Sequence, residues 1–242
     1  MTAVPRKGRK AASAKAAPHA GKTATALAEP APPSLADAAW QGDFLGELRL
    51  ENARIPPRFL GKTLENFLAE RNARRKAILG DADSYVRSFN FDTAPPSSLL
   101  LRGGVGCGKT HVAVAILRAV IAKGYRGLYY NMVDLLADIR RTYSDDHAID
   151  EAEFLDDLLA PDLLVIDDLG AEKTTEWVND RLYLIVNRRY DAERPLLVTT
   201  NLMTIEEMEQ KLGKRITSRL CEMCQLPFPE FPDEDFRKKH MH

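Results

Sequence analysis

The stretch that most constrains this chain runs from Leu99 to Thr110 and reads LLLRGGVGCGKT. It joins an apolar run to a glycine-rich turn, a lysine and a threonine, in the pattern G-x-x-x-x-G-K-T. The glycines permit positive φ, so backbone N–H groups can turn inward around a phosphate. The stretch therefore predicts a nucleotide-binding loop in which ATP is contacted by Gly103, Gly104, Val105, Gly106, Cys107, Gly108, Lys109, Thr110 and His111.

The residues on either side of this loop fit that function. Positions 98–101 indicate a buried strand, and the apolar positions from Val112 to Val120 have helical spacing. The start of that helix directs its positive end at the phosphates. Lys109 is expected to bring a charge to the β and γ phosphates, and the Thr110 hydroxyl to ligate Mg²⁺.

A pair of acids follows a second apolar run, Leu163-Leu164-Val165-Ile166-Asp167-Asp168. Four apolar residues ending in two carboxylates predict a central strand, and in an open parallel sheet the carboxyl ends of the strands face the ligand crevice. We expect Asp167 to hold Mg²⁺ through its waters, and Asp168 to orient or deprotonate the attacking water.

A third strand, PLLVTT at 195–200, exits into Asn201 at the same sheet edge. The Asn201 amide could hydrogen-bond both the γ-phosphate and the water. Together with expected strands at 126–131 and 225–228, these runs predict an α/β fold with a five-stranded parallel sheet. Helices are expected at 70–89, 133–143, 154–159, 174–190, 205–212 and 214–223, with Arg181, Arg188 and Arg189 outside the inward face of the helix at 174–190.

Charge is distributed unevenly along the chain. Residues 1–28 carry six Lys or Arg and no acid, which leaves 28 basic and 35 acidic residues in the remainder, a net charge of −7. A nucleic-acid site must therefore be local. We interpret 1–35 as a disordered basic tail rich in Ala, Pro and Lys, 36–68 as a partner-docking or linker segment, and 69–242 as an ATPase domain. Trp40 and Phe44 fit either docking or a cap on the core equally well.

The apolar runs and the cysteines of this chain bear on its location and on metal binding. No run of 18 apolar residues exists, so no membrane span is expected. Three cysteines favour a reducing compartment, and hence the cytoplasm. Cys221-x-x-Cys224 has zinc spacing without a second pair, so packing is the favoured role. Cys107 is expected to be reactive only through exposure.

Taken together, these motifs resemble the DnaC-type helicase loaders and IstB-type transposition helpers of the AAA+ superfamily. The resemblance spans 55–237 and rests on IPPRF, TLENF, GGVGCGKTH, LLVIDDLG followed by TEW and NRRY, TTN and ITSRL. It implies a P-loop NTPase three-layer sandwich without a C-terminal lid domain. It also implies that Arg219 is an arginine finger that reaches the γ-phosphate of a neighbouring subunit, and it matches Arg237 to a terminal family position.

The function expected from this resemblance is an ATP–Mg²⁺ switch that binds single-stranded DNA and helps to place a replicative helicase on it, with slow hydrolysis that depends on assembly. The helicase is expected to bind through residues 1–60. The alternatives are an ATPase helper of a transposase on duplex DNA, and a small-molecule kinase, which would need an arginine-rich lid. The candidate DNA contacts are Arg140, Arg141 and Tyr143, together with Lys62 and the cluster Arg74-Arg75-Lys76.

Overall fold

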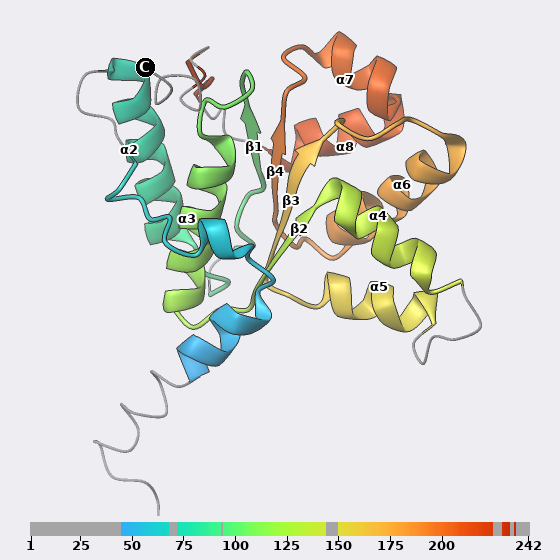
Figure 1. Cartoon of the computed structure of the whole chain (residues 1–242), viewed down its shortest axis with the longest axis horizontal. Helices are drawn as coiled ribbons and strands as arrows, with labels where there is room; N and C mark the ends of the chain where they lie inside the picture. The colour runs from blue at the N-terminus through green and yellow to red at the C-terminus, as the bar shows by residue number, and fades with distance from the viewer. Residues whose placement is uncertain are drawn as a thin grey trace, which may run out of the picture.

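A computed structural model describes residues 45–67, 72–92, 94–143, 150–224, 229–232 and 235. Within them the chain forms a four-stranded sheet in the order β1-β4-β3-β2, with every pairing parallel (Figure 1). The fifth strand expected at 225–228 lies outside the described residues. The strands are β1 (Leu99–Arg102), β2 (Gly127–Asn131), β3 (Leu163–Leu169) and β4 (Leu196–Thr200).

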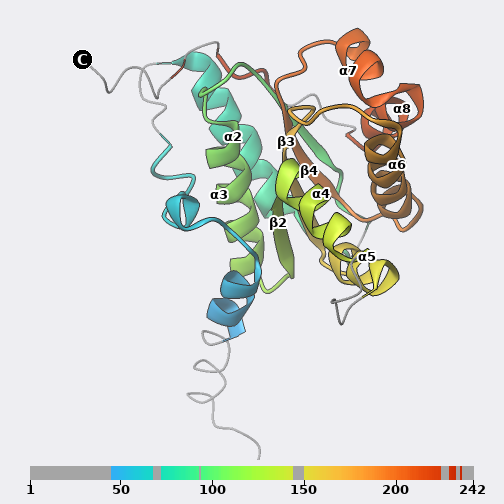
Figure 2. The same cartoon turned by 45° about the vertical axis from the view of Figure 1, so that its right-hand side comes forward.

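Helices cover both faces of the sheet. The pair α2 and α3 lies on one face, whereas α4, α5 and α6 lie on the other, and α7 and α8 pack together beside α6 (Figure 2). The expected α/β layering is therefore confirmed. The helices are η1 (Pro57–Phe59), α2 (Ala73–Ser88), α3 (Lys109–Ala122), α4 (Met132–Arg141), α5 (Glu151–Leu159), α6 (Glu176–Asp191), α7 (Ile205–Leu212) and α8 (Lys214–Met223).

The central strand β3 shows why the sequence adopts this architecture. Its side chains alternate between the two faces, as the two-residue period of a strand requires. Leu163 and Val165 join the core beneath α3, whereas Leu164 and Ile166 join the core beneath α4 and α6. A strand that is buried on both faces must be apolar along nearly its whole length, and this places the acids at its carboxyl end.

Side-chain caps set where several helices begin. Asn72 accepts hydrogen bonds from the backbone of Arg74 and Arg75, so α2 begins at Ala73. Thr175 accepts one from Val178, so α6 begins at Glu176, two residues later than the apolar spacing suggested. Short polar side chains satisfy the first N–H groups of a helix and so fix its boundary.

Arg189 is a correction to the sequence prediction. It was expected outside the inward face of its helix, but it is 1 % exposed. Its guanidinium donates to the carbonyls of Leu159, Pro161, Asp162 and Pro195, and so ties the segment between α5 and β3 to the start of β4. Burial lowers its pKa to about 9. A buried arginine is tolerated because carbonyl oxygens replace the water that it loses.

Residues 45–67 contribute to the same core. Residues 45–52 are helical, Ala53 and Phe67 are buried, and the Ala53 carbonyl accepts a 2.8 Å hydrogen bond from the Tyr129 N–H of β2. The expected tail at 1–35, and Trp40 and Phe44 with it, lie outside the described residues. No helix in the described part of the chain is both long and apolar enough to cross a membrane.

Candidate nucleotide-binding site

The glycine-rich loop joins β1 to α3 at the carboxyl end of the sheet, and two of its glycines adopt conformations that disfavour other residues. Gly106 has φ +74° and Gly108 has φ +107°. A side chain at Gly106 would place its Cβ 2.0 Å from Oδ1 of Asp235, and one at Gly108 would place it 2.9 Å from the Phe67 ring. The loop therefore packs against the segment that precedes α2 and against the segment that follows α8.

Lys109 stands at the first turn of α3, and its ammonium is buried. Its Nζ donates to the Gly103 carbonyl at 2.9 Å, the Gly104 carbonyl at 2.8 Å and the Asn201 Oδ1 at 2.7 Å. An ammonium has three protons, so these acceptors satisfy it. A phosphate oxygen would compete for the same protons. The structure thus brings Asn201, at the end of β4, to the loop lysine.

Asp167 lies at the centre of a cluster of hydroxyl groups. Its carboxylate accepts from the Thr110 Oγ1 at 3.0 Å, the Thr199 Oγ1 at 2.6 Å and the Tyr129 hydroxyl at 2.7 Å. Burial raises the pKa of Asp167, and the hydrogen bonds from Thr199, Tyr129 and Thr110 oppose that shift. Sequence reasoning paired Thr110 with Asp167 but missed Tyr129 and Thr199, which only the register of β2 and β4 beside β3 places there.

Asp168 adopts a backbone conformation that is unusual for a residue with a side chain. Its φ is +58°, and the β3–β4 register shifts between Ile166 and Leu169. Its N–H donates to the Thr199 Oγ1 at 2.9 Å. An irregularity of this kind re-aims a side chain at a sheet end, and Asp tolerates the left-handed region better than most residues. Asp168 is half-buried, whereas Asp167 is fully buried.

Aromatic and basic side chains pack together beside the glycine-rich loop. Phe67 meets the His111 ring at 5.3 Å and the Phe231 ring at 6.4 Å, between ring centroids. The Arg75 guanidinium lies 5.0 Å from the Phe67 ring and reaches the Cys107 carbonyl at 3.5 Å. Arg75 is only 5 % exposed, so its predicted role as a surface DNA contact is wrong.

His111 and Cys107 face the protein interior. The His111 Nε2 lies 2.9 Å from the Thr63 carbonyl, and burial lowers the pKa of this ring. A carbonyl can only accept, so Nε2 carries the proton. Cys107 is fully buried, and burial raises the pKa of its thiol. The expectation that Cys107 is reactive through exposure is therefore wrong.

The stretch of sequence that forms this site matches a known family of nucleotide-binding proteins. The model for IstB-like ATP-binding proteins matches residues 59–226. The chain belongs to this family. The replicative helicase loader DnaC of Escherichia coli K12 is 31 % identical to this IstB-like protein over 166 residues, which are 69 % of this chain and 65 % of DnaC. DnaC of Buchnera aphidicola from Acyrthosiphon pisum is 30 % identical over 162 residues, covering 67 % of this chain and 64 % of that relative.

Solved structures agree with this assignment. A crystal structure of the DnaC helicase loader has a TM-score of 0.63 at 27 % identity, and covers 69 % of the IstB-like protein and 96 % of the solved chain. The DnaI structure has a TM-score of 0.58 at 21 % identity, covering 75 % and 94 %, and supports the fold alone. The IstB-like domain therefore has the α/β fold of the AAA+ ATP-binding proteins.

Arg219 of the IstB-like domain lies apart from the phosphate loop of its own chain. It stands on α8, and its described contacts are with α6 and its own helix. Its Nε donates to the Asn187 Oδ1 at 2.7 Å, and its Nη1 reaches the Arg215 carbonyl at 3.3 Å. Lys109 bonds to Asn201 and Thr110 bonds to Asp167, whereas Arg219 has no described hydrogen bond to any of these four residues. Arg237, by contrast, lies outside the described residues.

The candidate DNA contacts at the end of α4 lie beside Trp177, a residue that sequence reasoning did not assign to DNA. The Arg140 guanidinium lies 4.6 Å from the centre of the Trp177 ring, and the centre of the Tyr143 ring lies 6.3 Å from the centre of the same Trp177 ring. Tyr143 is 49 % exposed. Arg141 pairs with Asp138 at 2.5 Å. Trp177 belongs to the TEW motif at the start of α6, and its proximity to α4 could not be read from the sequence. Of the other candidates, Arg74 and Lys76 are exposed and Lys62 is half-exposed.

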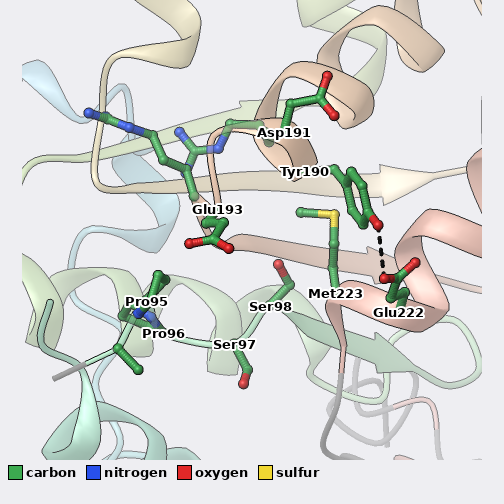
Figure 3. Close-up of a pocket in the computed structure, with 12 residues that line it drawn as sticks. Pro95, Pro96, Ser97, Ser98, Tyr190, Asp191, Glu193, Glu222 and Met223 are labelled. Carbon is green, nitrogen blue, oxygen red and sulfur yellow. Dashed lines mark hydrogen bonds between the residues drawn. The ribbon is translucent and has the colours of Figure 1, made fainter.

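A large cleft lies elsewhere on the IstB-like domain. It has a volume of about 580 Å³ and is lined by Pro95, Ser98, Tyr190, Glu193 and Met223, among others (Figure 3). These residues precede β1 and β4 or end α6 and α8, so the cleft opens at the amino end of the strands. Nucleotides bind at the opposite, carboxyl end. Near this cleft, Cys224 is half-buried, and burial raises the pKa of its thiol to about 12. The described residues hold no group of three metal-ligating side chains that includes the Cys221-x-x-Cys224 pair.

Proposed function

We propose that this chain is an ATP-hydrolysing helicase loader that binds single-stranded DNA and a replicative helicase in the cytoplasm. Two observations support it: the hydrogen-bonded pairs Lys109–Asn201 and Thr110–Asp167 at the strand ends, and the similarity to proteins named DnaC helicase loader. The helicase would bind through residues 1–60, of which only those from position 45 are described.

In this proposal, Lys109 binds the β and γ phosphates, and the loop amides from Gly103 to Thr110 surround them. Thr110 and Asp167 hold Mg²⁺. The donor set fits, because a hydroxyl and a carboxylate are hard oxygen ligands and Mg²⁺ is usually bound by one or two carboxylates plus substrate phosphates. Bound Mg²⁺ supplies neutralisation of the phosphate charge. Tyr129 and Thr199 hold the Asp167 carboxylate in place.

Hydrolysis in this proposal uses the half-buried Asp168 as the group that orients or deprotonates water, and Asn201 as a polar contact to both water and γ-phosphate. Arg219 would reach the nucleotide of a neighbouring copy, in keeping with its described hydrogen bonds, which go to α6 and α8 and not to the loop of its own chain. Turnover then depends on self-association, because an arginine supplied in trans stabilises the charge of the transition state. Whether the bound nucleotide is ATP or its hydrolysis product would therefore indicate whether the subunits have assembled.

The proposal that this chain binds single-stranded DNA rests on the cluster of Tyr143, Trp177 and Arg140. An exposed aromatic ring beside an arginine offers a base a stacking surface and its phosphate a charge. Bases in a duplex are already stacked and paired, so this surface favours unpaired strands. It therefore supports the helicase loader over the transposase helper, which acts on duplex DNA.

Fluorescence anisotropy with a labelled oligonucleotide, single-stranded or annealed to its complement, tests this function. We expect the full chain with ATP and Mg²⁺ to bind the single strand more tightly, with affinity falling steeply with salt, at a slope of about −0.7 per contacted phosphate. Trp177→Ala should weaken single-strand binding about tenfold, since stacking contributes roughly 1–3 kcal/mol per base. Trp177→Phe is the matched control, because it keeps an aromatic face.

Equal or tighter binding of the duplex would favour the transposase helper. Binding that survives in Trp177→Ala but disappears when residues 1–28 are deleted would place the DNA site in the basic tail and would refute the assignment to α4 and α6.

A further inference from the structure

Arg219 lies on a polar and aromatic stripe of α6. Tyr183, Asn187 and Tyr190 are spaced four and three residues apart, so they lie on one face of the helix. The Arg219 guanidinium carbon is 5.0 Å from the centre of the Tyr183 ring and 5.6 Å from that of Tyr190. Between the two rings, the Asn187 Oδ1 accepts from the Arg219 Nε at 2.7 Å. The guanidinium is thus held by its faces and by its inner nitrogen.

This environment leaves the charge of Arg219 unneutralised. Among the described residues no carboxylate forms an ion pair with it, although Glu222 stands one helical turn further along α8. Glu222 instead accepts a 2.8 Å hydrogen bond from the Tyr190 hydroxyl (Figure 3). A ring face and a neutral amide orient an arginine without cancelling its charge. The full charge therefore remains available to an anion.

The outer end of the guanidinium is also accessible for a new contact. Nη1 makes a long bond of 3.3 Å to the Arg215 carbonyl, and within the described residues Nη2 has no hydrogen-bond acceptor. Arginine recognises phosphate best through two terminal N–H groups that lie parallel in its planar fork. The α6 stripe holds the other side of the fork and leaves this edge unobstructed.

We propose that Tyr183, Asn187 and Tyr190 are positioning residues that pre-orient Arg219 toward the phosphate of a nucleotide bound by a neighbouring copy of this chain. This inference rests on the proposed function. The stripe is not needed to hold α6 and α8 together, because Leu182, Ile185, Ile216 and Leu220 already bury that contact. Its residues are half-buried at the side of that core. Pre-orientation matters because a small misplacement of a catalytic group lowers the rate steeply.

The test uses the full chain at concentrations where sedimentation shows self-association, with single-stranded DNA present. Tyr183→Leu removes the ring but keeps an apolar side chain, and Asn187→Leu removes the acceptor. Each should lower kcat for ATP hydrolysis by about tenfold, whereas KM for ATP and ATP affinity in the dilute monomer stay unchanged. Tyr183→Phe keeps the ring and should keep the activity of the unmodified chain.

A double-variant cycle separates positioning from general packing. In an Arg219→Ala background, Tyr183→Leu and Asn187→Leu should cause no further loss of kcat, because they act through Arg219. An equal loss in both backgrounds, or equal effects of Tyr183→Leu and Tyr183→Phe, would overturn the inference. If Arg219→Ala lowers kcat but the stripe variants do not, the positioning role fails while the proposed arginine finger stands. If Arg219→Ala has no effect, both fail.

Discussion

Replacing Tyr129 with Phe removes a single oxygen from the interior of the candidate site. The Tyr129 hydroxyl is a donor to the buried Asp167 carboxylate at 2.7 Å. Burial, and then the nearby charge of Asp167, raise the pKa of this phenol well above its usual value of 10.0, so it is a donor at neutral pH. Tyr129→Phe leaves the ring in place and takes away only this hydrogen bond.

The size of the effect follows from the contacts that remain. A hydrogen bond to a charged group contributes roughly 1.5–3 kcal/mol. Thr110 and Thr199 still donate to Asp167, so we expect a loss of about 2 kcal/mol. For a domain of this size, 1 kcal/mol shifts Tm by roughly 2–4 °C. The Tm of Tyr129→Phe should therefore fall by about 4–8 °C at pH 7 without nucleotide.

The loss should depend on pH. In the folded chain burial raises the Asp167 pKa above 3.8, so the folded state binds more protons than the unfolded state between 3.8 and that raised value. Stability therefore falls as pH rises through this window. Without the phenol the pKa rises further and the fall is larger. The difference between the two proteins should be greatest above the window and smallest below pH 3.8.

Thermal unfolding followed by circular dichroism from pH 4 to pH 8 measures this difference. Tyr130→Phe is the matched control, because its hydroxyl donates at 3.2 Å to Asp138, which also pairs with Arg54 and Arg141. That variant should lose less than about 1 kcal/mol, as expected for a partly exposed polar contact. A Tyr129→Phe loss that is absent, or equal at every pH, would refute a hydrogen bond to a buried, charged carboxylate.

Three further outcomes test the proposed chemistry. Lys109→Ala should abolish ATP binding in a filter or calorimetric assay while circular dichroism stays unchanged, and retained affinity would count against the phosphate loop. Asp168→Asn should still bind ATP but hydrolyse it roughly 10²–10⁴-fold more slowly. Asn tolerates the same left-handed backbone, so only the charge is lost. A loss of ATP binding together with hydrolysis would reassign Asp168 to metal binding. Mixing Arg219→Ala with Lys109→Ala should recover part of the hydrolysis when the subunits associate, because the second protein offers its arginine to the nucleotide of the first. No recovery despite confirmed association would show that Arg219 acts within its own chain.

Local sequence predicted those parts of the site that neighbouring residues determine. The order strand, glycine loop, lysine and helix is contained in a single run, and the acids at the end of β3 follow directly from its apolar pattern. The strand end at Asn201 was placed by the same logic. These features need only the rule that parallel strands present their carboxyl ends to one edge.

The remaining features depend on contacts between distant segments. Tyr129 and Thr199 reach Asp167 only because β2 and β4 flank β3, an order that no strand reveals by itself. Arg75 and Arg189 look like solvated charges in the sequence, yet one packs under the phosphate loop and the other binds four carbonyls. Polar residues buried by tertiary partners are therefore the ones that pattern reasoning misplaces.

The backbone bond between Ala53 and Tyr129 has a practical consequence for preparing this protein. In the described sheet β2 is an outer strand, Ala53 bonds to it, and Phe67 further along the same segment packs against Gly108 of the loop. A shortened version starting at position 69, where the ATPase domain was expected to begin, would uncover that strand and the Phe67 contact to Gly108. Uncovered strand edges pair with other chains, so such a fragment should precipitate on expression. Expression designs for crystallisation or binding studies should therefore begin no later than residue 45.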